Sequence, residues 1–487
     1  MCESASALTV ADHKVTDNRL KRKRLESIDN TQVQTYRFLN TPAIQRTRTS
    51  RRLLPRIYSR FMDASTLSLG AGLITIIISC TIRLHVGFLA ISFAWIVGVY
   101  FADMSPREVM DGFPTRLFVT LTGVTLLFAL AQANGTLDLI AQKAVRFCKG
   151  NVGVMPMMFF LLSFILSSIG PGSIASTALM APMAMAVAGQ VRIPAFLMAI
   201  MIGHGGNAGA LSPIAPAGII VNGVMTENGL GGYETLTFLN NMMAQTVVVF
   251  TAYFLFGGWR LLGRRHEGDL VVPTTDKSSQ HQHTLERKHW CTIVVIGLLL
   301  SSVVLFNVDV GLGAFACTIL LVVLKAGDET QAVSQMPWRV IMMVCGVTVL
   351  ISVLDKTGGL DLFTSMLVNI STANTVTAIM AFTTGFISIY SSTSGVVLPM
   401  FLPTVTDMAT QLGNVDPLAI ASSMNVGAHL VDVSALSTLG ALCMAAAPQH
   451  EDSRKLFNKL MAWGLSMTLV GAATCWVLFT VLGVGLG

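Results

Sequence analysis

The stretch that decides the fold runs from Ser167 to Gly223 and reads SSIGPGSIASTALMAPMAMAVAGQVRIPAFLMAIMIGHGGNAGALSPIAPAGIIVNG. It is apolar enough to lie in a membrane, yet small and helix-breaking residues interrupt it at Ile169–Ser173 and again from Gly203 to Gly218. A bilayer tolerates broken helices only where the freed backbone groups are buried in protein or line a watery cavity. Two breaks this close together predict half-helix ends that converge on one site, as in secondary transporters.

The composition is that of a membrane protein. The chain has 487 residues, of which 53% are hydrophobic and only 12% charged, whereas soluble domains carry about 25% charge. We therefore expect an all-α polytopic membrane protein. The eight cysteines are scattered without a CxxC pair, which favours small core residues over disulfides or metal ligands. The sequence predicts no metal and no cofactor.

The N-terminal region, residues 1–65, differs from the rest. Up to Arg60 it holds 13 Lys and Arg against 5 Asp and Glu, and it contains no apolar run of membrane-spanning length. Such a composition is typical of a disordered tail, either solvated or lying on a lipid surface. A second interpretation is an organelle transit peptide, because the region is rich in Arg and Ser and poor in acids.

The remainder repeats itself. Motifs recur at an offset of 223 or 224 residues: His85-Val86-Gly87 matches Asp309-Val310-Gly311, Gly123-Val124-Thr125 matches Gly346-Val347-Thr348, and Gly172 matches Gly395. Asn207 and Gly209 match Asn425 and Gly427 at an offset of 218. We infer a first transporter repeat over 66–262 and a second over 290–487, joined by a polar linker at 263–289. Four histidines lie in and beside the linker: His266, His281, His283 and His289. We interpret this segment as a solvated linker rather than as a metal-binding site.

Each repeat is expected to contain about five transmembrane helices, one re-entrant hairpin and one broken helix. The hairpin arms of the first repeat are short for full spans, at ~15 to 17 residues against the roughly 20 that a bilayer needs. If both arms enter and leave on one side, the number of true spans per repeat is odd. The second repeat is then inverted relative to the first; parallel repeats would follow if both arms crossed.

The candidate substrate-binding residues gather at the hairpin tips and the breaks. Half-helix N-termini attract anions, and glycines let the backbone approach a ligand closely. Simple packing by small residues is the alternative, but the same clusters occur at equivalent places in both repeats. The predicted residues are Ser168, Gly170, Pro171, Gly172, Ser173, Asn207, Ser212 and Pro213 in the first repeat, and Ser391, Ser392, Thr393, Ser394, Asn425, Ser434, Ser437 and Thr438 in the second.

Three ionisable residues fall within predicted membrane segments. Asp432 and His429 lie in the second broken helix, and His204 lies just before Asn207. Ionisable side chains are expensive in a bilayer and are functional candidates there. We predict them as coupling-ion residues, with Asp432 able to bind Na+ or a proton, against the alternative of neutral or backbone-capped structural groups.

Several of these motifs resemble those of a known family. The first half resembles MatC-type dicarboxylate carriers in GFPTRLFVTLTGVTLLFALAQANGTLD (Gly112–Asp138), IGPGSIASTALMAP (Ile169–Pro182) and NAGALSPIAPAGIIVNG (Asn207–Gly223). The second half, with SSTSGVVLP (Ser391–Pro399), resembles the wider ion-transporter superfamily, which includes the divalent-anion/sodium symporters. The resemblance implies inverted repeats, a homodimer, and elevator-type alternating access.

The resemblance also implies roles for the two tips. In the symporters, a Ser-Asn-Thr motif at each tip helps to bind Na+ and the substrate carboxylate. Those roles fall on Ser168–Ser173 and Ser391–Ser394, but neither tip has that motif here. Coupling to Na+ or to H+ therefore stays open.

Together these features predict a secondary transporter of small di- or tricarboxylates such as malonate, succinate or malate. It would lie in the plasma membrane or an organelle inner membrane, in contact with lipid and not with nucleic acid. The alternatives are a cation/proton antiporter or another anion transporter of the same superfamily, and a non-transporting sensor. An enzyme is disfavoured, because the sequence has no nucleotide-binding loop and no HExxH motif.

Overall fold

Apolar runs separated by Gly, Pro and small polar residues fold as helices, because a membrane offers backbone N–H and C=O groups no other partners. The computed structural model describes residues 63–81, 84–137, 139–140, 151–265, 286–306, 308–413, 415–448 and 450–484. Within these ranges the chain is helical, and its only bridge pairing joins Asn151 and Arg265. Nearly all of the predicted tail and most of the predicted linker lie outside the described residues.

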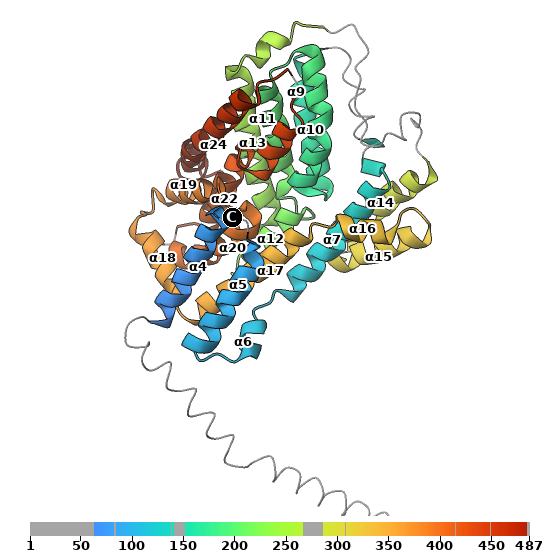
Figure 1. Cartoon of the computed structure of the whole chain (residues 1–487). Coiled ribbons are helices and arrows are strands. Elements are labelled where there is room, and N and C mark those ends of the chain that lie inside the picture. The colour runs from blue at the N-terminus through green and yellow to red at the C-terminus, as the bar shows by residue number, and fades with distance from the viewer. Residues whose placement is uncertain are drawn as a thin grey trace, which may run out of the picture. The chain divides into compact units, whose positions relative to one another are not determined.

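The helices of the first half are shown in blue to green in Figure 1. They are α4 (Ala64–Thr81), α5 (Val86–Trp95) with the π-helical η1 (Ile96–Phe101), α6 (Pro106–Met110), α7 (Thr115–Ala133), α9 (Val154–Ile169), α10 (Gly172–Val191), α11 (Ala195–Ala210), α12 (Pro216–Glu227), α13 (Glu234–Leu255) and the short η2 (Gly258–Leu261).

The second half follows the same order. It contains α14 (Arg287–Phe306), α15 (Val310–Val323), α16 (Glu329–Gln335), α17 (Trp338–Lys356), α18 (Gly359–Asn369), α19 (Val376–Ser388), η3 (Thr393–Val397), α20 (Leu398–Phe401), η4 (Leu402–Thr404), α21 (Val405–Gln411), α22 (Pro417–Leu430), η5 (Val431–Val433), α23 (Thr438–Ala445), α24 (Ser453–Cys475) and η6 (Trp476–Val481). The order of elements agrees with the predicted repeats, and their inverted orientation stays a prediction.

Glycines that match between the halves meet across them. A Cβ added to Gly346 of α17 would lie 2.2 Å from the carbonyl oxygen of Gly87 in α5. In the equivalent pair, a Cβ on Gly123 of α7 would lie 2.3 Å from the carbonyl oxygen of Gly311 in α15. Small residues permit such close approach of membrane helices. Each half therefore contributes one helix to each of two matching backbone contacts.

Two hairpins occur at the predicted positions. Their re-entrant character stays a prediction, because α10 has 20 residues and is long enough to cross a membrane, unlike the short arm that was expected. In the first, α9 and α10 pack against each other, and the turn lies at Gly170 and Pro171. In the second, α19 and the segment Thr393–Gln411 meet at an angle of 117° across a short break. The second arm is less regular than the first, since it passes through π-helical η3, α20 and 3-10 helical η4 before α21.

The broken helices end later than the glycines suggest. A break was expected between Gly203 and Gly218. The break does lie within that range, but α11 continues past Gly203 to Ala210, so its start was predicted too early. The glycines of α11 serve packing instead: a Cβ on Gly205 would lie 2.4 Å from the carbonyl oxygen of Phe160, and one on Gly209 would lie 2.6 Å from that of Phe164. The interruption is the turn at 211–215, ahead of Pro216.

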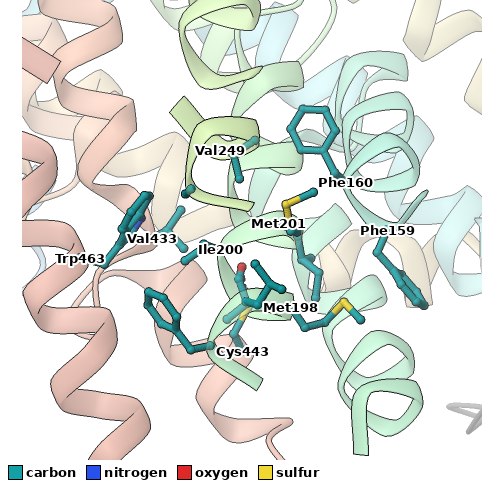
Figure 2. Packing of buried hydrophobic residues seen from close by; sticks show 14 of the residues in the cluster. Phe159, Phe160, Met198, Ile200, Met201, Val249, Val433, Cys443 and Trp463 are labelled. Carbon is teal, nitrogen blue, oxygen red and sulfur yellow. Dashed lines mark hydrogen bonds between the residues drawn. The ribbon is translucent and has the colours of Figure 1, made fainter. Parts of the chain in front are cut away.

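Helix α11 lies at the centre of the largest buried cluster. Figure 2 shows Phe159 and Phe160 of α9 on one side of it, with Val433 and Trp463 on the other. Every residue of α11 is buried. Because all of its faces are covered by other parts of the protein, α11 is a core element rather than a lipid-facing one. The hairpin arms α9 and α10 are thus held against a rigid centre.

Helices able to cross a membrane are abundant. By length and hydropathy there are six among the described residues, and up to seven if the bent pair of the second hairpin counts as one span. The six are Pro106–Ala133, Gly172–Val191, Glu234–Leu255, Trp338–Lys356, Pro417–Ala445 and Ser453–Val481. The predicted all-α polytopic fold is confirmed, and the chain is an integral, multi-pass membrane protein.

Candidate functional site

The second hairpin tip is built by hydroxyl residues. Ser392 caps the start of η3, and its Oγ accepts a hydrogen bond from the Gly395 N–H at 3.2 Å. The next residue, Thr393, turns its side chain toward the second broken helix. Its Oγ1 donates to Asp432 Oδ1 at 2.6 Å. The tip is therefore tied directly to the interruption between α22 and α23.

That interruption is capped in a similar way. Ser437 Oγ accepts from the Gly440 N–H at 3.2 Å and donates to the backbone carbonyls of Ser434, at 2.8 Å, and Asp432. These bonds fix the turn from η5 into α23. They hold the carboxyl group of Asp432 facing the tip.

A cavity of about 230 Å³ lies between the second tip and this turn. It reaches the first hairpin and α12 through Ser173, Ile174 and Ala217. Asp432 and His429 also line it, and none of its lining residues is Lys or Arg. The Ser and Thr side chains around it are those of Ser173, Ser391, Ser392, Thr393, Ser394, Ser437 and Thr438, and Tyr390 adds a phenolic hydroxyl. With Asp432 and His429, nine of the predicted site residues thus line one space.

His429 is among the residues that line this cavity. Its Nδ1 lies 2.8 Å from the backbone oxygen of Asn425, one turn earlier in α22. A carbonyl only accepts, so Nδ1 carries the proton, and Nε2 is left as the acceptor of the neutral ring. The side chain therefore adds a hydrogen-bonding group without adding a fixed charge.

The first tip borders a second cavity of about 240 Å³ with a different lining. Gly170, Pro171 and Gly172 form one wall, and Phe128 and Ile220 are among the apolar residues opposite. Gly170 has φ +145° and Gly172 has φ +79°, values that side-chain-bearing residues rarely adopt. Ser173, Ile174, Ala217 and Ser394 line both cavities, so the two adjoin.

Sequence reasoning missed the α7 face of this second cavity, which includes Thr125, Ala129 and Gln132. All three lie in the segment 112–138 that carries the family resemblance. That overlap was the available signal, although nothing in the segment marks these side chains as cavity-lining.

Other predicted residues line neither cavity, and two of them form hydrogen bonds that join neighbouring elements of the site. Asn207 Nδ2 donates to the backbone oxygen of His429 at 2.8 Å, which joins the two broken helices. Ser212 Oγ donates to the backbone oxygen of Ser168 at 2.7 Å, which joins the first broken helix to the first hairpin. Pro213 is exposed. The structure thus separates these residues from the predicted hydroxyl residues that line a cavity.

Asn425 and Ser434 are also buried away from the cavities. Both side-chain atoms of the Asn425 amide lack a hydrogen-bond partner within the described ranges, as do Ser434 Oγ and Asn207 Oδ1. Buried polar atoms of this kind call for an explanation such as an ordered water or ion. Amide and hydroxyl oxygens are ligands that hard cations accept.

His204 does not join the other two coupling-ion candidates. Trp463 Nε1 donates to His204 Nε2 at 2.9 Å, and His204 Nδ1 lies 2.6 Å from Gln245 Oε1. An indole N–H can only donate, so Nε2 accepts and Nδ1 carries the proton. Both nitrogens of the neutral ring are therefore engaged in the core, and neither faces a cavity.

The bond from Asn207 supports a stability prediction. An Asn207→Ala variant is expected to lose about 1–3 kcal/mol of folding free energy, because the His429 carbonyl is left without this donor in a buried place. The measurement is the unfolding midpoint of the purified protein in detergent. The matched control is Asn228→Ala, whose bond to Val224 O stays within one partly buried helix end. Equal midpoints for the two variants would contradict the bracing role.

Comparison with known proteins supports this description. Residues 62–210 match the family described as the N-terminus of the dicarboxylate carrier protein MatC. Over this stretch the chain resembles MatC-type carriers. The predicted resemblance is confirmed there, and the matched region contains the first tip and Asn207. A search of curated proteins gives no significant match.

The fold also resembles that of a solved transporter. The crystal structure of the YdaH transporter of Alcanivorax borkumensis, described as having an unusual topology, superposes with a TM-score of 0.53 at 14% identity. The match covers 80% of this chain and 90% of that one. At this identity the likeness concerns the fold. The region that resembles MatC-type carriers, residues 62–210, thus lies within a chain whose fold resembles that of a solved membrane transporter.

Proposed function

We propose that the protein is a secondary transporter of small di- or tricarboxylates of the malonate, succinate and malate class. The observation that carries this proposal is the cavity beside the second tip. It is lined by seven Ser and Thr side chains, and no Lys or Arg is among the residues that line it. Such a space can bind a carboxylate through neutral donors and can also release it, as transport requires.

The chemistry of the tip supports an anionic substrate. Ser392 begins a helical segment whose first N–H groups point toward the tip, and a helix N-terminus carries a partial positive charge. Hydroxyl groups rotate to donate to a carboxylate oxygen. Transporters of this general design place half-helix ends at an anionic substrate near mid-membrane.

The motion we propose is elevator-type alternating access. The first hairpin and α11 share one buried cluster, to which the second hairpin adds Ala381 and Ile389, while other residues of the second hairpin share another cluster with α5 and α17. The site lies where these groups meet, so a relative movement would change its exposure. A homodimer in contact with lipid completes the proposal and is carried over from the family resemblance.

The transport is proposed to be coupled to Na+ or H+. The tips lack the Ser-Asn-Thr motif that the symporters use, which weakens the case for Na+ at those positions. The side-chain oxygens of Asn207 and Asn425 have no hydrogen-bond partner among the described residues, which favours a buried cation site near them. Asp432 lines the proposed substrate cavity, which favours a proton as the coupling ion.

The test is uptake of labelled malonate, succinate, malate and citrate into proteoliposomes. We expect at least one dicarboxylate to accumulate above equilibrium under a Na+ or a pH gradient, while a monovalent cation such as choline does not. Protons moving against Na+ without any carboxylate would instead favour the cation/proton antiporter. Uptake of no carboxylate under either gradient would contradict the proposal.

A further inference from the structure

The second repeat contains an acid–hydroxyl pair that spans two elements. Thr393 of the hairpin tip donates to Asp432 Oδ1 at 2.6 Å, although the two residues are 39 positions apart. The threonine is buried, whereas the Asp432 side chain is partly exposed and lines the cavity. The carboxyl group thus has one oxygen held by the tip and stands at the edge of the proposed substrate space.

The first repeat cannot form the same pair at its tip. The offset of 223 that relates Gly172 to Gly395 places Gly170 where Thr393 stands in the second repeat. Gly170 has φ +145°, and a Cβ built on it would lie 1.9 Å from the Phe128 ring. The hydroxyl partner is therefore replaced by a glycine packed under an aromatic ring.

The acid itself also lacks a counterpart. The turns after the two interruptions match: Ala215 N–H donates to Ser212 O at 2.9 Å, and Ser437 N–H donates to Ser434 O at 3.1 Å. A Cβ on Gly218 would lie 1.9 Å from the backbone oxygen of Ser212, and a Cβ on Gly440 would lie 1.9 Å from that of Ser434. Ser212 and Ser434 are thus equivalent.

The spacing ahead of these serines differs between the repeats. Ser212 follows Gly209 by three residues, whereas Ser434 follows the equivalent Gly427 by seven. The four extra residues include the 3-10 turn η5, Val431–Val433, which carries Asp432. The acid is an addition to the second repeat alone.

Among the described residues that line the cavity beside Asp432, none supplies a fixed positive charge. The other titratable side chains on the cavity are His429 from α22 and Tyr390 from the second hairpin. The first hairpin contributes Ser173 and Ile174, α12 contributes Ala217, and α23 contributes Thr438 and Leu439. An ionised carboxylate in such a place is costly unless it gains a counter-ion or a proton. An anionic substrate beside it would add repulsion.

We propose that Asp432 is the proton-binding residue that couples transport to a pH gradient, with one such site in each protomer. This inference rests on the proposed carboxylate transport. Oδ2 takes a proton from water on the loading side, the neutral acid then tolerates the substrate carboxylate, and the proton leaves to water after the site has opened on the other side. Proton binding should raise carboxylate affinity by about 5- to 150-fold, the usual range of coupling between two ligands.

The test compares Asp432→Asn with a matched control, Asp416→Asn, in the full-length protein. Asp416 caps the start of α22, where it accepts from the Leu418 N–H at 2.8 Å, and it does not line the cavity. We expect Asp432→Asn to lose accumulation of labelled succinate under a pH gradient. Its succinate counterflow should be detectable and independent of pH between 5.5 and 8, whereas Asp416→Asn should behave like the wild type.

A second measurement applies if the variant does not transport. Succinate is added to purified protein in weak buffer with a pH-indicator dye. The wild type should take up protons on binding, and Asp432→Asn should bind without proton uptake. The proposal would be overturned if Asp432→Asn accumulated succinate under a pH gradient. It would also be overturned if this variant took up as many protons on binding as the wild type does. Wild-type accumulation driven by Na+ alone would overturn it too.

The failure of the proton site and the failure of the transport function give different results. A wild type that binds and transports no carboxylate contradicts the transport function itself. A wild type that accumulates succinate while Asp432→Asn keeps its pH response contradicts only the proton site.

Thr393→Val gives an independent check in which the acid is retained. Without the Thr393 donor, the ionised carboxylate loses a hydrogen bond and protonation becomes easier. The pH of half-maximal uptake should move upward by up to about one unit. The control is Thr404→Val in the same hairpin, where the hydroxyl bonds only within its own arm. An unshifted pH profile in Thr393→Val would also overturn the proposal.

Discussion

A Gly172→Val variant is expected to reach the membrane folded and to lose at least about 90% of carboxylate uptake. Gly172 has φ +79°, and a Cβ there would lie 2.9 Å from Pro216 Cδ at the start of α12. A left-handed conformation costs an L-residue roughly 1–2 kcal/mol, and overpacking adds about 1–3 kcal/mol. About 1.4 kcal/mol corresponds to a tenfold change in an equilibrium constant. The added side chain should therefore shift the equilibrium away from the arrangement in which the tip and α12 close around the two cavities.

The matched control is Gly229→Val. Gly229 also has φ +79°, but no atom lies within 4 Å of its Cβ position. The two variants share the backbone strain and differ in what the side chain meets. Labelled succinate uptake per purified protein should be near normal for Gly229→Val and near background for Gly172→Val. Equal uptake by the two variants would contradict the assignment of the first hairpin tip to the transport site.

A Gly346→Leu variant is expected to lose about 3 kcal/mol of stability or to fail to fold. The Cβ would lie 2.2 Å from the backbone oxygen of Gly87, which belongs to another helix and cannot move as a side chain does. This contact joins α5 to α17 across the two halves. The measurement is the unfolding midpoint in detergent, together with the yield of monodisperse protein.

The control for this variant is Gly70→Leu in α4, where the Cβ position has no atom within 4 Å. Its stability should change by no more than about 0.5 kcal/mol, as for most surface substitutions. A Gly346→Leu protein as stable as Gly70→Leu would show that the helices can separate freely, and the close packing of the halves would then be in doubt.

The helices and the first hairpin were predictable because apolar length and glycine–proline breaks act locally. The turn predicted at Gly170–Ser173 lies between α9, which ends at Ile169, and α10, which begins at Gly172. The break expected from Gly203 begins later than predicted, because glycine in a membrane helix serves close packing as readily as interruption. The deciding contacts, with Phe160 and Phe164, belong to another helix.

The site was predictable in part. The tip hydroxyls of the second repeat do line a cavity, since a tip must face something other than lipid. The Thr393–Asp432 bond depends on how the hairpin and the broken helix pack, which no local pattern encodes. The spacings from Gly209 to Ser212 and from Gly427 to Ser434 did contain the signal that Asp432 lies in an added turn. His204 looked functional by residue type alone, but its partners Gln245 and Trp463 place it in the core.

The most direct test of the central claim is substrate protection of a cysteine placed at Ser394, which borders both cavities. The rate of maleimide labelling of Ser394→Cys, above the wild-type background, is measured with and without saturating succinate. Thr410→Cys, at an exposed position of the same hairpin, serves as the control. Carboxylate binding between the tips predicts that succinate slows labelling of Ser394→Cys and leaves Thr410→Cys unchanged. A protein that transports succinate while Ser394→Cys is labelled at the same rate with and without it would contradict the site.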